Sequence, residues 1–284
     1  MILRKHHRIL VQGITGRQGS FWTQAMLDYG ARVVGGVNPA KAGSQHLGLP
    51  VYAKASEADG FEVALLFVPP MAAKTAAIDA AEAGAQVIVC LSEHVPLHDT
   101  LEMLAAADAN GARVFGPNTA GIATPGESFA GILPVFNKKL FRPGRIGLVS
   151  RSGSLGTLMA KTLSAAGEGI STFLGVGGDP LAGTSLAEAV SLLAADERTE
   201  KILLCGEIGG AGEEEAAERA KGLAKPLVAF VAGRAAPEGR KMGHAGAIVA
   251  EGKGGYADKR RALEAAGVAV CDLPSEAPAL LAAA

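Results

Sequence analysis

The sequence predicts an α/β protein built from two doubly wound parallel sheets, one following the other along the chain. Short apolar segments alternate with helical patterns from end to end, which is typical of strand-helix-strand units. This alternation occurs twice in 284 residues, a length sufficient for two ordinary domains. Because 49% of the residues are hydrophobic, the chain can fill two buried cores.

Five apolar segments of the first half are predicted as strands, at residues 8–12, 31–37, 63–68, 85–91 and 112–115. Helical periodicity between them predicts helices at about 21–29, 71–83 and 99–110. A glycine follows each helix, where a left-handed C-cap favours this residue: Gly30, Gly84 and Gly111. We therefore expect a first domain over residues 1–122.

The second half repeats the pattern, with strands expected near 145–150, 170–176, 201–205, 227–231 and 268–271. Its helices are expected at about 154–166, 185–195, 213–223 and 257–266. Residues 122–144 are rich in glycine and proline and show no clear period. We expect a connection over 123–143 and a second domain over 144–284.

Charge and cysteine content exclude several classes of protein. Lys and Arg total 27 against 28 Asp and Glu, and no basic cluster is interleaved with aromatic residues, so nucleic acid is not an expected partner. Cys90, Cys205 and Cys271 lie far apart in apolar segments, which indicates reduced core residues of a cytoplasmic protein. The N-terminus resembles neither a signal peptide nor a membrane span. His94 and His98 have no acidic or cysteine partner at ligand spacing, so no metal site is predicted.

A glycine-rich turn over residues 12–19 follows the first strand and begins the first helix. Ligands of such sheets bind at the carboxyl ends of the strands, where free backbone N–H groups attract phosphate. A dinucleotide site would need an acidic residue at the end of the second strand, but Gly35-Gly36-Val37-Asn38-Pro39 stands there. Arg17 and Lys41 add positive charge, which favours a ligand with more phosphates than NAD. The alternative is that the glycines only permit tight packing.

Ser152, Gly153 and Ser154 stand where a strand of the second half leads into a helix. Hydroxyl groups and free N–H groups at a helix N-terminus form an anion site. The alternative is that Ser152 or Ser154 serves only as the N-cap, and the two uses are compatible.

His244 lies between small residues in the segment Met242-Gly243-His244-Ala245-Gly246-Ala247, so nothing beside it in sequence shields the ring. Such an imidazole is competent for metal binding, proton transfer or nucleophilic attack. Glu207 ends a strand at the same sheet edge and is expected to point toward His244, where a carboxylate would fix the tautomer and raise the basicity of the other nitrogen. The alternatives are a turn histidine and a surface glutamate. The acids at 213–215 are expected to form a first helical turn favoured by the helix dipole.

Several sequence blocks, taken in order, resemble the α subunit of succinyl-CoA synthetase, the NDP-forming succinate-CoA ligase, and its acyl-CoA synthetase relatives. The resemblance covers nearly the whole chain. Its blocks are residues 12–16, 35–39, 116–118, 149–153, 177–180, 206–210, 241–247 and 262–267. It implies a Rossmann-like CoA-binding domain followed by a flavodoxin-like ligase domain that carries a phosphohistidine loop.

The resemblance also implies a role for each site. His244 would carry a phosphoryl group from a nucleoside triphosphate to a carboxylic acid, Glu207 would orient the ring, and Ser152, Gly153 and Ser154 would hold the phosphate. The acyl phosphate would then react with the thiol of coenzyme A. The implied CoA-binding residues are Thr15, Gly16, Arg17, Gln18, Asn38, Lys41, Val68, Pro69, Ser92 and Glu93. The implied acid-binding residues are Asn118, Thr119, Gly156 and Thr157.

A nucleotide site is missing from the sequence, which contains neither a Gly-x-x-x-x-Gly-Lys-[Ser/Thr] loop nor a recognisable ATP-grasp domain. The family supplies it on a separate β subunit, so the resemblance implies an ATP-grasp partner that binds ATP or GTP with Mg, in a heterodimer or heterotetramer. Alone, the chain is expected to bind coenzyme A without turnover.

Two departures from the family pattern leave the acid open. Thr119-Ala120 replaces a cysteine, and residues 154–158 replace Thr-Leu-Thr-Tyr-Glu. Both change the size and polarity of the implied acid pocket, so malate or another small acid is an alternative to succinate. The alternative functions are a CoA-binding regulatory subunit without turnover and an NAD-dependent oxidoreductase.

Overall fold

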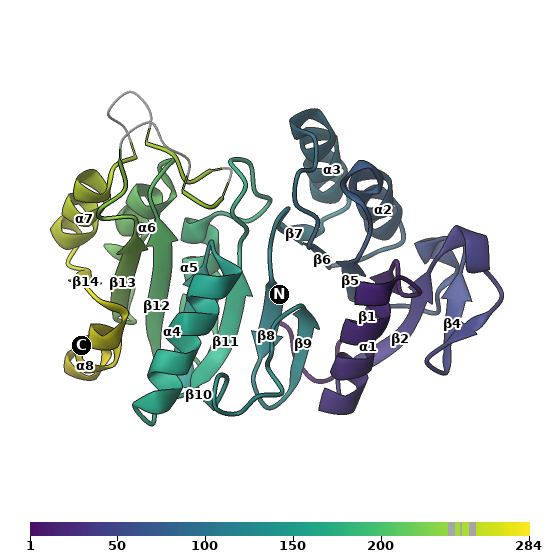
Figure 1. Ribbon diagram of the computed structural model, residues 1–284, viewed down its shortest axis with the longest axis horizontal. Coiled ribbons are helices and arrows are strands. Elements are labelled where there is room, and N and C mark those ends of the chain that lie inside the picture. Colours follow the sequence, from purple (N-terminus) through teal and green to yellow (C-terminus); the bar gives the residue numbers. More distant parts are fainter. Residues whose placement is uncertain (238–241, 245, 250–253) are drawn as a thin grey trace.

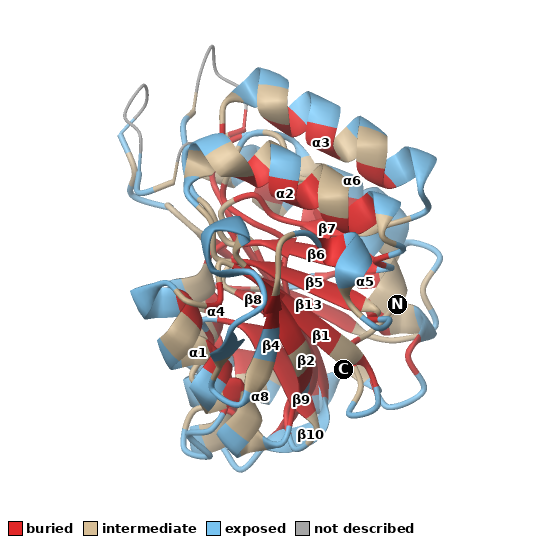
Figure 2. Ribbon diagram, turned by 90° about the vertical axis from the view of Figure 1, so that its right-hand side faces the viewer, coloured by how far each residue is buried: buried red, intermediate tan, exposed pale blue. Residues whose placement is uncertain are grey.

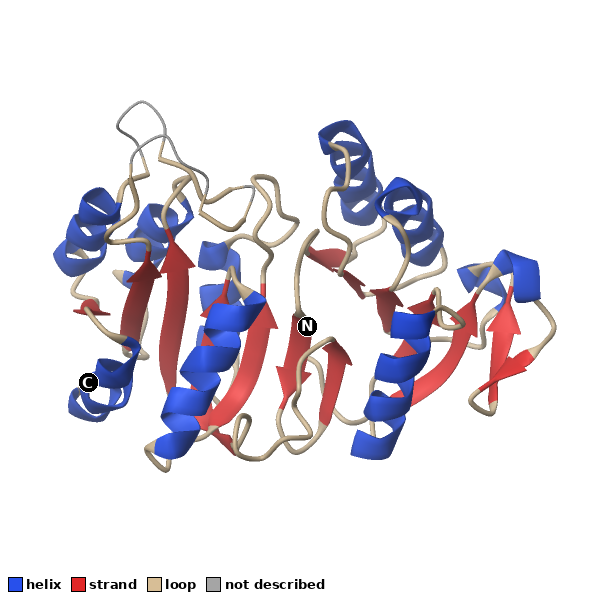
Figure 3. Cartoon of the chain, in the orientation of Figure 1, coloured by secondary structure: helices blue, strands red, loops and turns tan. Residues whose placement is uncertain are grey.

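A computed structural model describes residues 1–237, 242–244, 246–249 and 254–284. It confirms two α/β units side by side, each built around a seven-stranded sheet (Figures 1 and 3). Among the described helices, none combines the length and the apolar character needed to cross a membrane.

The first sheet has the strand order β3-β4-β2-β1-β5-β6-β7. Its strands are β1 (Arg8–Gln12), β2 (Arg32–Val37), β3 (Gln45–His46), β4 (Leu49–Tyr52), β5 (Val63–Leu66), β6 (Val87–Cys90) and β7 (Arg113–Phe115). Only β3 is antiparallel to its neighbour in this sheet. The strand order reverses direction at β1, which lies between β2 and β5. A parallel sheet binds its ligands at such a switch point.

Three helices cover the first sheet: α1 (Arg17–Tyr29), α2 (Pro70–Glu82) and α3 (Leu97–Ala109). Helices α2 and α3 pack together, while α1 packs on β2 and β9. Helix α1 ends at Gly30, whose left-handed φ of +93° lets its N–H bond to the carbonyl of Leu27 at 2.9 Å. Gly84 and Gly111 also have positive φ after α2 and α3, as predicted.

The second sheet has the order β14-β13-β12-β10-β11-β8-β9. Its parallel strands are β10 (Pro143–Ser150), β11 (Ile170–Gly175), β12 (Lys201–Glu207), β13 (Leu227–Ala232) and β14 (Ala269–Cys271). Helices α4 (Gly153–Ala165) and α8 (Ala277–Ala283) pack together, and α5 (Leu186–Ala195), α6 (Gly212–Ala220) and α7 (Tyr256–Ala265) form a second group. Helix α8 was not expected.

A hairpin occupies part of the segment that was expected to be an irregular connection. Strands β8 (Gly121–Thr124) and β9 (Ser128–Gly131) pair antiparallel, and β8 pairs antiparallel with β11. All residues of both strands are buried, so polar and apolar residues do not alternate and the sequence shows no strand period. The hairpin extends the second sheet toward the first unit.

Buried strands form the centre of the molecule, and the helices expose their outer faces (Figure 2). Cys90, Cys205 and Cys271 are free thiols in this interior, and burial raises their pKa values to about 11, 12 and 11. The prediction that the three cysteines are buried core residues is confirmed.

Contacts between the two units fix their relative position. The Arg4 guanidinium pairs with the buried Asp196 carboxylate. The Thr184 hydroxyl donates to the Val114 carbonyl at 2.6 Å, and the Gly183 N–H donates to the Gly116 carbonyl at 2.9 Å. The carboxyl ends of the strands of both sheets are therefore held along one side of the molecule (Figure 1).

Candidate active site

His244 lies over the carboxyl ends of the strands of the second sheet. Its ring packs against Gly178, where an added Cβ would lie 2.5 Å from the ring Cγ. Gly246, two residues later, donates its N–H to the Gly178 carbonyl at 3.1 Å. Only a glycine at 178 leaves room for the ring in this position. Lys241 and Ala245 of the same sequence block lie outside the described residues.

The contact predicted between Glu207 and His244 is present. His244 Nδ1 lies 2.9 Å from Oε2 and 3.1 Å from Oε1 of Glu207. Glu207 is the last residue of β12 and is only 5% exposed. A carboxylate on Nδ1 keeps the proton on that nitrogen and leaves Nε2 with a free lone pair. The pair therefore presents Nε2 as a nucleophile.

The pKa of His244 is raised above its ordinary value. Its hydrogen bond to Glu207 is the main cause, and this effect outweighs the partial burial of the ring, which acts in the opposite direction. The Glu207 and Glu93 charges add to the increase, whereas the Arg151 charge opposes it. The imidazole is therefore a stronger base than a free histidine.

Arg151 lies between two carboxylates. Its Nε is 3.5 Å from Glu207 Oε1, and its Nη1 is 3.4 Å from Glu213 Oε1. Nη1 also donates to the carbonyl of Gly209 at 2.9 Å. Sequence reasoning placed Arg151 in a family block but gave it no role.

The acids at 213–215 lie in the first turn of α6, as predicted, but Glu213 has a further role. Its side chain has no exposed surface, and its Oε2 pairs with Lys259 Nζ at 2.6 Å. Lys259, also fully buried, donates further to Glu214 Oε2 and to the Gly210 carbonyl, each at 2.8 Å. Glu213 is thus more than a first-turn acid that interacts with the dipole, because the fold buries it against a cation from α7.

Ser152 is the N-cap of α4, since its hydroxyl accepts the N–H of Leu155 at 3.3 Å. The capping interpretation of this serine is therefore confirmed. Ser152 is buried, whereas Ser154 is exposed, and the two hydroxyl oxygens lie 3.2 Å apart. Ser152 directly follows Arg151, which contacts Glu207. The N-terminus of α4 therefore begins beside Glu207, the carboxylate that binds His244.

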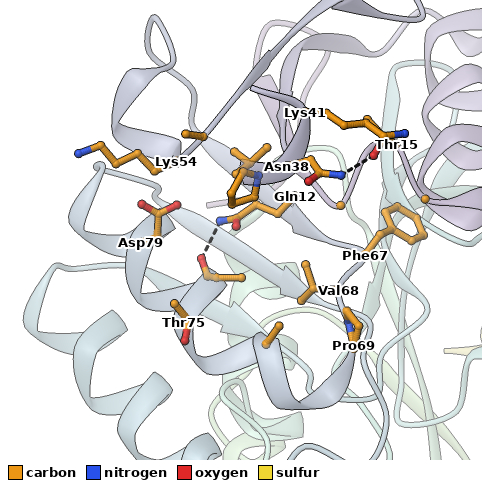
Figure 4. Close-up of a pocket in the computed structure, with 17 residues that line it drawn as sticks. Gln12, Thr15, Asn38, Lys41, Lys54, Phe67, Val68, Pro69, Thr75 and Asp79 are labelled. Atoms are coloured by element: carbon orange, nitrogen blue, oxygen red, sulfur yellow. Dashed lines mark hydrogen bonds between the residues drawn. The ribbon is translucent and has the colours of Figure 1, made fainter. Parts of the chain in front are cut away.

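A cavity of about 700 Å³ opens at the switch point of the first sheet (Figure 4). Six of the predicted CoA-binding residues line it: Thr15, Gly16, Asn38, Lys41, Val68 and Pro69. Arg17 and Gln18 are exposed in the first turn of α1, and Ser92 and Glu93 follow β6, outside the lining set. The lining also includes Lys54, Thr75 and Asp79, which sequence reasoning missed because they lie outside the glycine-rich blocks.

The glycine turn forms one wall of this cavity. Gly13 has a φ of +80°, and an added Cβ would lie 2.3 Å from the Phe67 carbonyl oxygen. Asn38, at the end of β2, donates its amide N–H to the Thr15 hydroxyl at 2.6 Å (Figure 4). An amide and a lysine thus stand where a dinucleotide site would carry a carboxylate.

A chain of hydrogen bonds leads from the cavity to the histidine. The Ser92 hydroxyl donates to the Val68 carbonyl at 2.6 Å, and the Asn118 N–H donates to the Ser92 carbonyl at 2.9 Å. The Gly178 N–H then donates to the Asn118 carbonyl at 3.2 Å. Gly178 packs against the His244 ring. Hydrogen bonds and this contact therefore connect the cavity with the histidine along the strand ends of the two sheets.

The four predicted acid-binding residues differ in what they offer a ligand. Asn118 is half-buried and its amide donates to Asp179 at 2.9 Å. Thr119 is buried and its hydroxyl donates to the Gly175 carbonyl, while the Thr157 hydroxyl donates to the Gly153 carbonyl. Gly156 faces the ring of Phe173 inside the protein. The structure therefore does not bring Gly156 to the open end of the sheet.

Two family models match the chain. A CoA binding domain matches residues 4–94, and a CoA-ligase domain matches residues 149–269. The first includes all residues that line the cavity, and the second includes Glu207 and His244.

Similar proteins match over nearly the full length. The ADP-forming succinate-CoA ligase subunit alpha 2 of Archaeoglobus fulgidus is 45% identical, covering 99% of this chain and 98% of that protein. The ADP-forming sulfoacetate-CoA ligase subunit SauD of Bilophila wadsworthia is 43% identical over the same shares of the two chains. A solved ATP citrate lyase of Methanosaeta concilii shares the fold, with a TM-score of 0.90 at 24% identity over 99% of this chain and 50% of that one.

Proposed function

Because this chain belongs to the family of succinate-CoA ligase α subunits, we propose that it carries the phosphoryl group of an NDP-forming acyl-CoA ligase on His244. The observation that supports this most directly is the bond between His244 Nδ1 and the buried Glu207. That bond leaves Nε2 as the nitrogen that accepts the phosphoryl group.

In the first step, Nε2 of His244 forms a bond to the γ-phosphorus of the nucleoside triphosphate, and the nucleoside diphosphate leaves. Glu207 accepts the Nδ1–H bond throughout and stabilises the positive charge that develops on the ring. A carboxylate oxygen of the acid then attacks the phosphorus, which restores the imidazole and forms an acyl phosphate.

The N-terminus of α4 is the proposed phosphate site. Ser152, Gly153 and Ser154 stand at the positive end of the helix dipole, beside the Arg151 that contacts Glu207. Ser152 serves as the N-cap and adds a hydroxyl to the site. The developing charge on the transferred phosphoryl group would be stabilised there.

Coenzyme A is proposed to occupy the cavity of the first sheet. Its elongated shape suits a cavity at the switch point, and Lys41 and Lys54 stand on opposite sides of the opening (Figure 4). The hydrogen-bonded row from Val68 through Ser92 and Asn118 gives the thiol end a path toward the acyl phosphate. Attack of the thiolate on the acyl carbon would release inorganic phosphate and form the thioester.

A second subunit with an ATP-grasp fold is proposed to supply ATP or GTP with Mg. The relatives are themselves α subunits, which implies a β partner in the family. We propose a heterodimer or a larger αβ assembly in which the partner's nucleotide site delivers the phosphoryl group to His244.

The acid is proposed to be a small carboxylic acid with a second anionic group. Two relatives of similar identity are named for succinate and for sulfoacetate, and both acids combine a carboxylate with another anion. Succinate, malate and sulfoacetate are the members of this class to be compared.

The test is acyl-CoA formation by the chain mixed with its co-purified β subunit. We expect the wild type to form acyl-CoA from one of the three acids with release of one phosphate per thioester. His244→Asn should abolish formation while leaving coenzyme A binding intact, and His98→Asn, at an exposed histidine of α3, is the matched control. A wild type that binds coenzyme A but stays inactive with its partner would favour a regulatory subunit, and binding of NAD would favour an oxidoreductase.

A further inference from the structure

Behind the His244–Glu207 pair lies a buried group of charges, for which the proposed phosphoryl transfer has no direct use. It consists of Arg151 from the end of β10, Glu213 from α6 and Lys259 from α7. Neither Glu213 nor Lys259 has exposed surface. Such a group is costly to bury and needs a physical explanation beyond surface solvation.

We propose that Lys259 and Glu213 are positioning residues for phosphoryl transfer, which hold Arg151 between two carboxylates and so set the charge that Glu207 presents to His244. The inference rests on the proposed function in that it assigns these residues to the His244 reaction. Neither residue touches the ring or the reacting atoms.

Glu213 acts on Glu207 through two contacts. Its Oε1 accepts the backbone N–H of Glu207 at 3.0 Å, which fixes the end of β12. The same oxygen lies 3.4 Å from Arg151 Nη1, while Arg151 Nε lies 3.5 Å from Glu207. Both charge contacts are long, so the guanidinium is shared between the two carboxylates. Without the charge on Glu213, Arg151 would have Glu207 as its main carboxylate partner.

Lys259 compensates the charge of Glu213. A carboxylate with no exposed surface is costly to bury unless a cation lies beside it. Lys259 Nζ lies 2.6 Å from Glu213 Oε2. All three of its protons are used, because it also donates to Glu214 and to the carbonyl of Gly210. Loss of Lys259 alone would leave Glu213 to Arg151, whereas loss of Lys259 together with the Glu213 charge would move Arg151 toward Glu207.

The contacts of Lys259 also link the chain that follows His244 to the end of β12, where Glu207 lies. Helix α7 follows His244 in sequence, and Lys259 binds Gly210, three residues beyond Glu207. The Gly209 N–H donates to the Gly254 carbonyl at 2.8 Å beside the same contact. Lys259 thus fixes both the geometry and the charge of the Glu207 end of the pair.

Among the residues that the structure describes, the charged groups that face His244 are Glu207 from β12, Arg151 just after β10 and Glu93 from the loop after β6. Glu207 and Glu93 favour the protonated ring, and Arg151 disfavours it. If Arg151 shifts toward Glu207, the negative potential at the ring falls. The pKa of His244 should then fall, whereas a lysine that served only to stabilise the fold would leave it unchanged.

The experiment is titration of the histidine rings in the full-length chain by nitrogen-edited NMR, with His244→Asn to assign the resonance. Lys259→Met and the double variant Lys259→Met/Glu213→Gln are compared with the wild type. The double variant leaves no unpaired charge at either position, and the amide oxygen that it introduces can still accept the Glu207 N–H. Lys225→Met is the matched control. Lys225 donates to the Asp196 carbonyl, which precedes β12 and so lies near the opposite end of that strand from Glu207.

We expect the midpoint of His244 to fall by at least about half a pH unit in the double variant, where Arg151 is left with Glu207, and to stay unchanged in Lys225→Met. In Lys259→Met the remaining Glu213 charge should draw Arg151 away from Glu207, so the midpoint should rise. Wild-type titration in the folded double variant would overturn the proposal. If both variants failed to fold, a role in folding alone would account for the cluster and the proposal would fail. The titration needs neither nucleotide nor partner, so a negative result in the acyl-CoA assay would refute the proposed function separately.

Discussion

The Nδ1 atom of His244 lies 2.9 Å from Oε2 of Glu207, although the two residues are 37 positions apart in sequence and come from different parts of the second sheet's edge. The pairing arises because β12 ends in Glu207 and the segment after β13 returns over the same strand ends. A buried carboxylate on one ring nitrogen leaves the other nitrogen as the reactive one.

The Glu207→Gln substitution should slow phosphorylation of His244 by at least about 100-fold, a loss typical for removal of a positioned acid–base partner. The amide keeps the shape of the carboxylate but not the charge that stabilises the developing imidazolium. Rapid-quench measurement of phosphohistidine in the αβ complex checks this. Glu200→Gln, at an exposed glutamate of the same domain, should react at the wild-type rate.

The pH dependence of phosphorylation should show an acidic limb set by His244. Only the ring with a free Nε2 accepts a phosphoryl group, and its pKa is raised by Glu207. The rate should therefore fall as the pH drops through that raised value, above the ordinary histidine midpoint of about 6.5. In Glu207→Gln the limb should move to lower pH. If the acidic limb stays in place, a group other than His244 sets it.

Folding stability should also depend on the protonation of His244, but the contribution of His244 to stability should decrease with pH, whereas the phosphorylation rate increases. A histidine whose pKa is higher in the folded than in the unfolded state stabilises the fold fully below its unfolded pKa. That contribution is lost as the pH rises through the folded pKa. The difference in unfolding free energy between wild type and His244→Asn should therefore decrease between mildly acidic and alkaline pH, as measured by urea denaturation. A difference that grows with pH would contradict the assignment.

Gly13→Ala should abolish coenzyme A binding and lower stability by about 1–3 kcal/mol. The new Cβ would lie 2.3 Å from the Phe67 carbonyl oxygen, and the residue would have to hold a φ of +80°. Gly30→Ala provides the control, since Gly30 has a φ of +93° and no atom within 4 Å of an added Cβ. It shares the backbone strain but not the clash, so calorimetry should find wild-type coenzyme A affinity there.

Replacement of Lys41 or Lys54 by alanine should weaken coenzyme A binding by about tenfold at low salt. Each substitution removes a positive charge from the lining of the cavity in which the phosphates are proposed to bind. The loss should shrink as ionic strength rises, because salt screens exposed charges. Lys139→Ala, at an exposed lysine outside the lining residues, should bind as the wild type does. Equal affinities for all of these variants would place coenzyme A elsewhere.

The fold was predictable because its main elements have strong periods. Strand β1 was predicted with the bounds that the structure shows, and the predicted helices agree to within a few residues at each end. The approach of Glu207 to His244 was also predictable, because carboxyl ends of neighbouring parallel strands meet at one edge.

The buried charges could not be predicted in the same way. Lys259 shares a face of α7 with Leu263, four residues later, but a lysine is most often solvated and nothing in its neighbours indicates a buried partner. Glu213 resembles an ordinary acid at a helix start. Only the packing of α6 against α7 brings the two together.

The strands β8 and β9 escaped prediction for another reason. Each has four residues, and all of them are buried between neighbours. Their sequences, Gly-Ile-Ala-Thr and Ser-Phe-Ala-Gly, mix glycine and hydroxyl residues with apolar ones and show neither alternation nor an unbroken apolar run, so they cannot be told from a loop.

The most direct test of the account is the position of the phosphoryl group on the chain. After incubation of the αβ complex with nucleoside triphosphate, phosphorus NMR and peptide mapping should find one acid-labile phosphate per chain, attached to Nε2 of His244 and absent from His244→Asn. Phosphate on Nδ1 would contradict the role of Glu207. Phosphate on another residue, or none in an active complex, would contradict the assignment of His244 as the carrier.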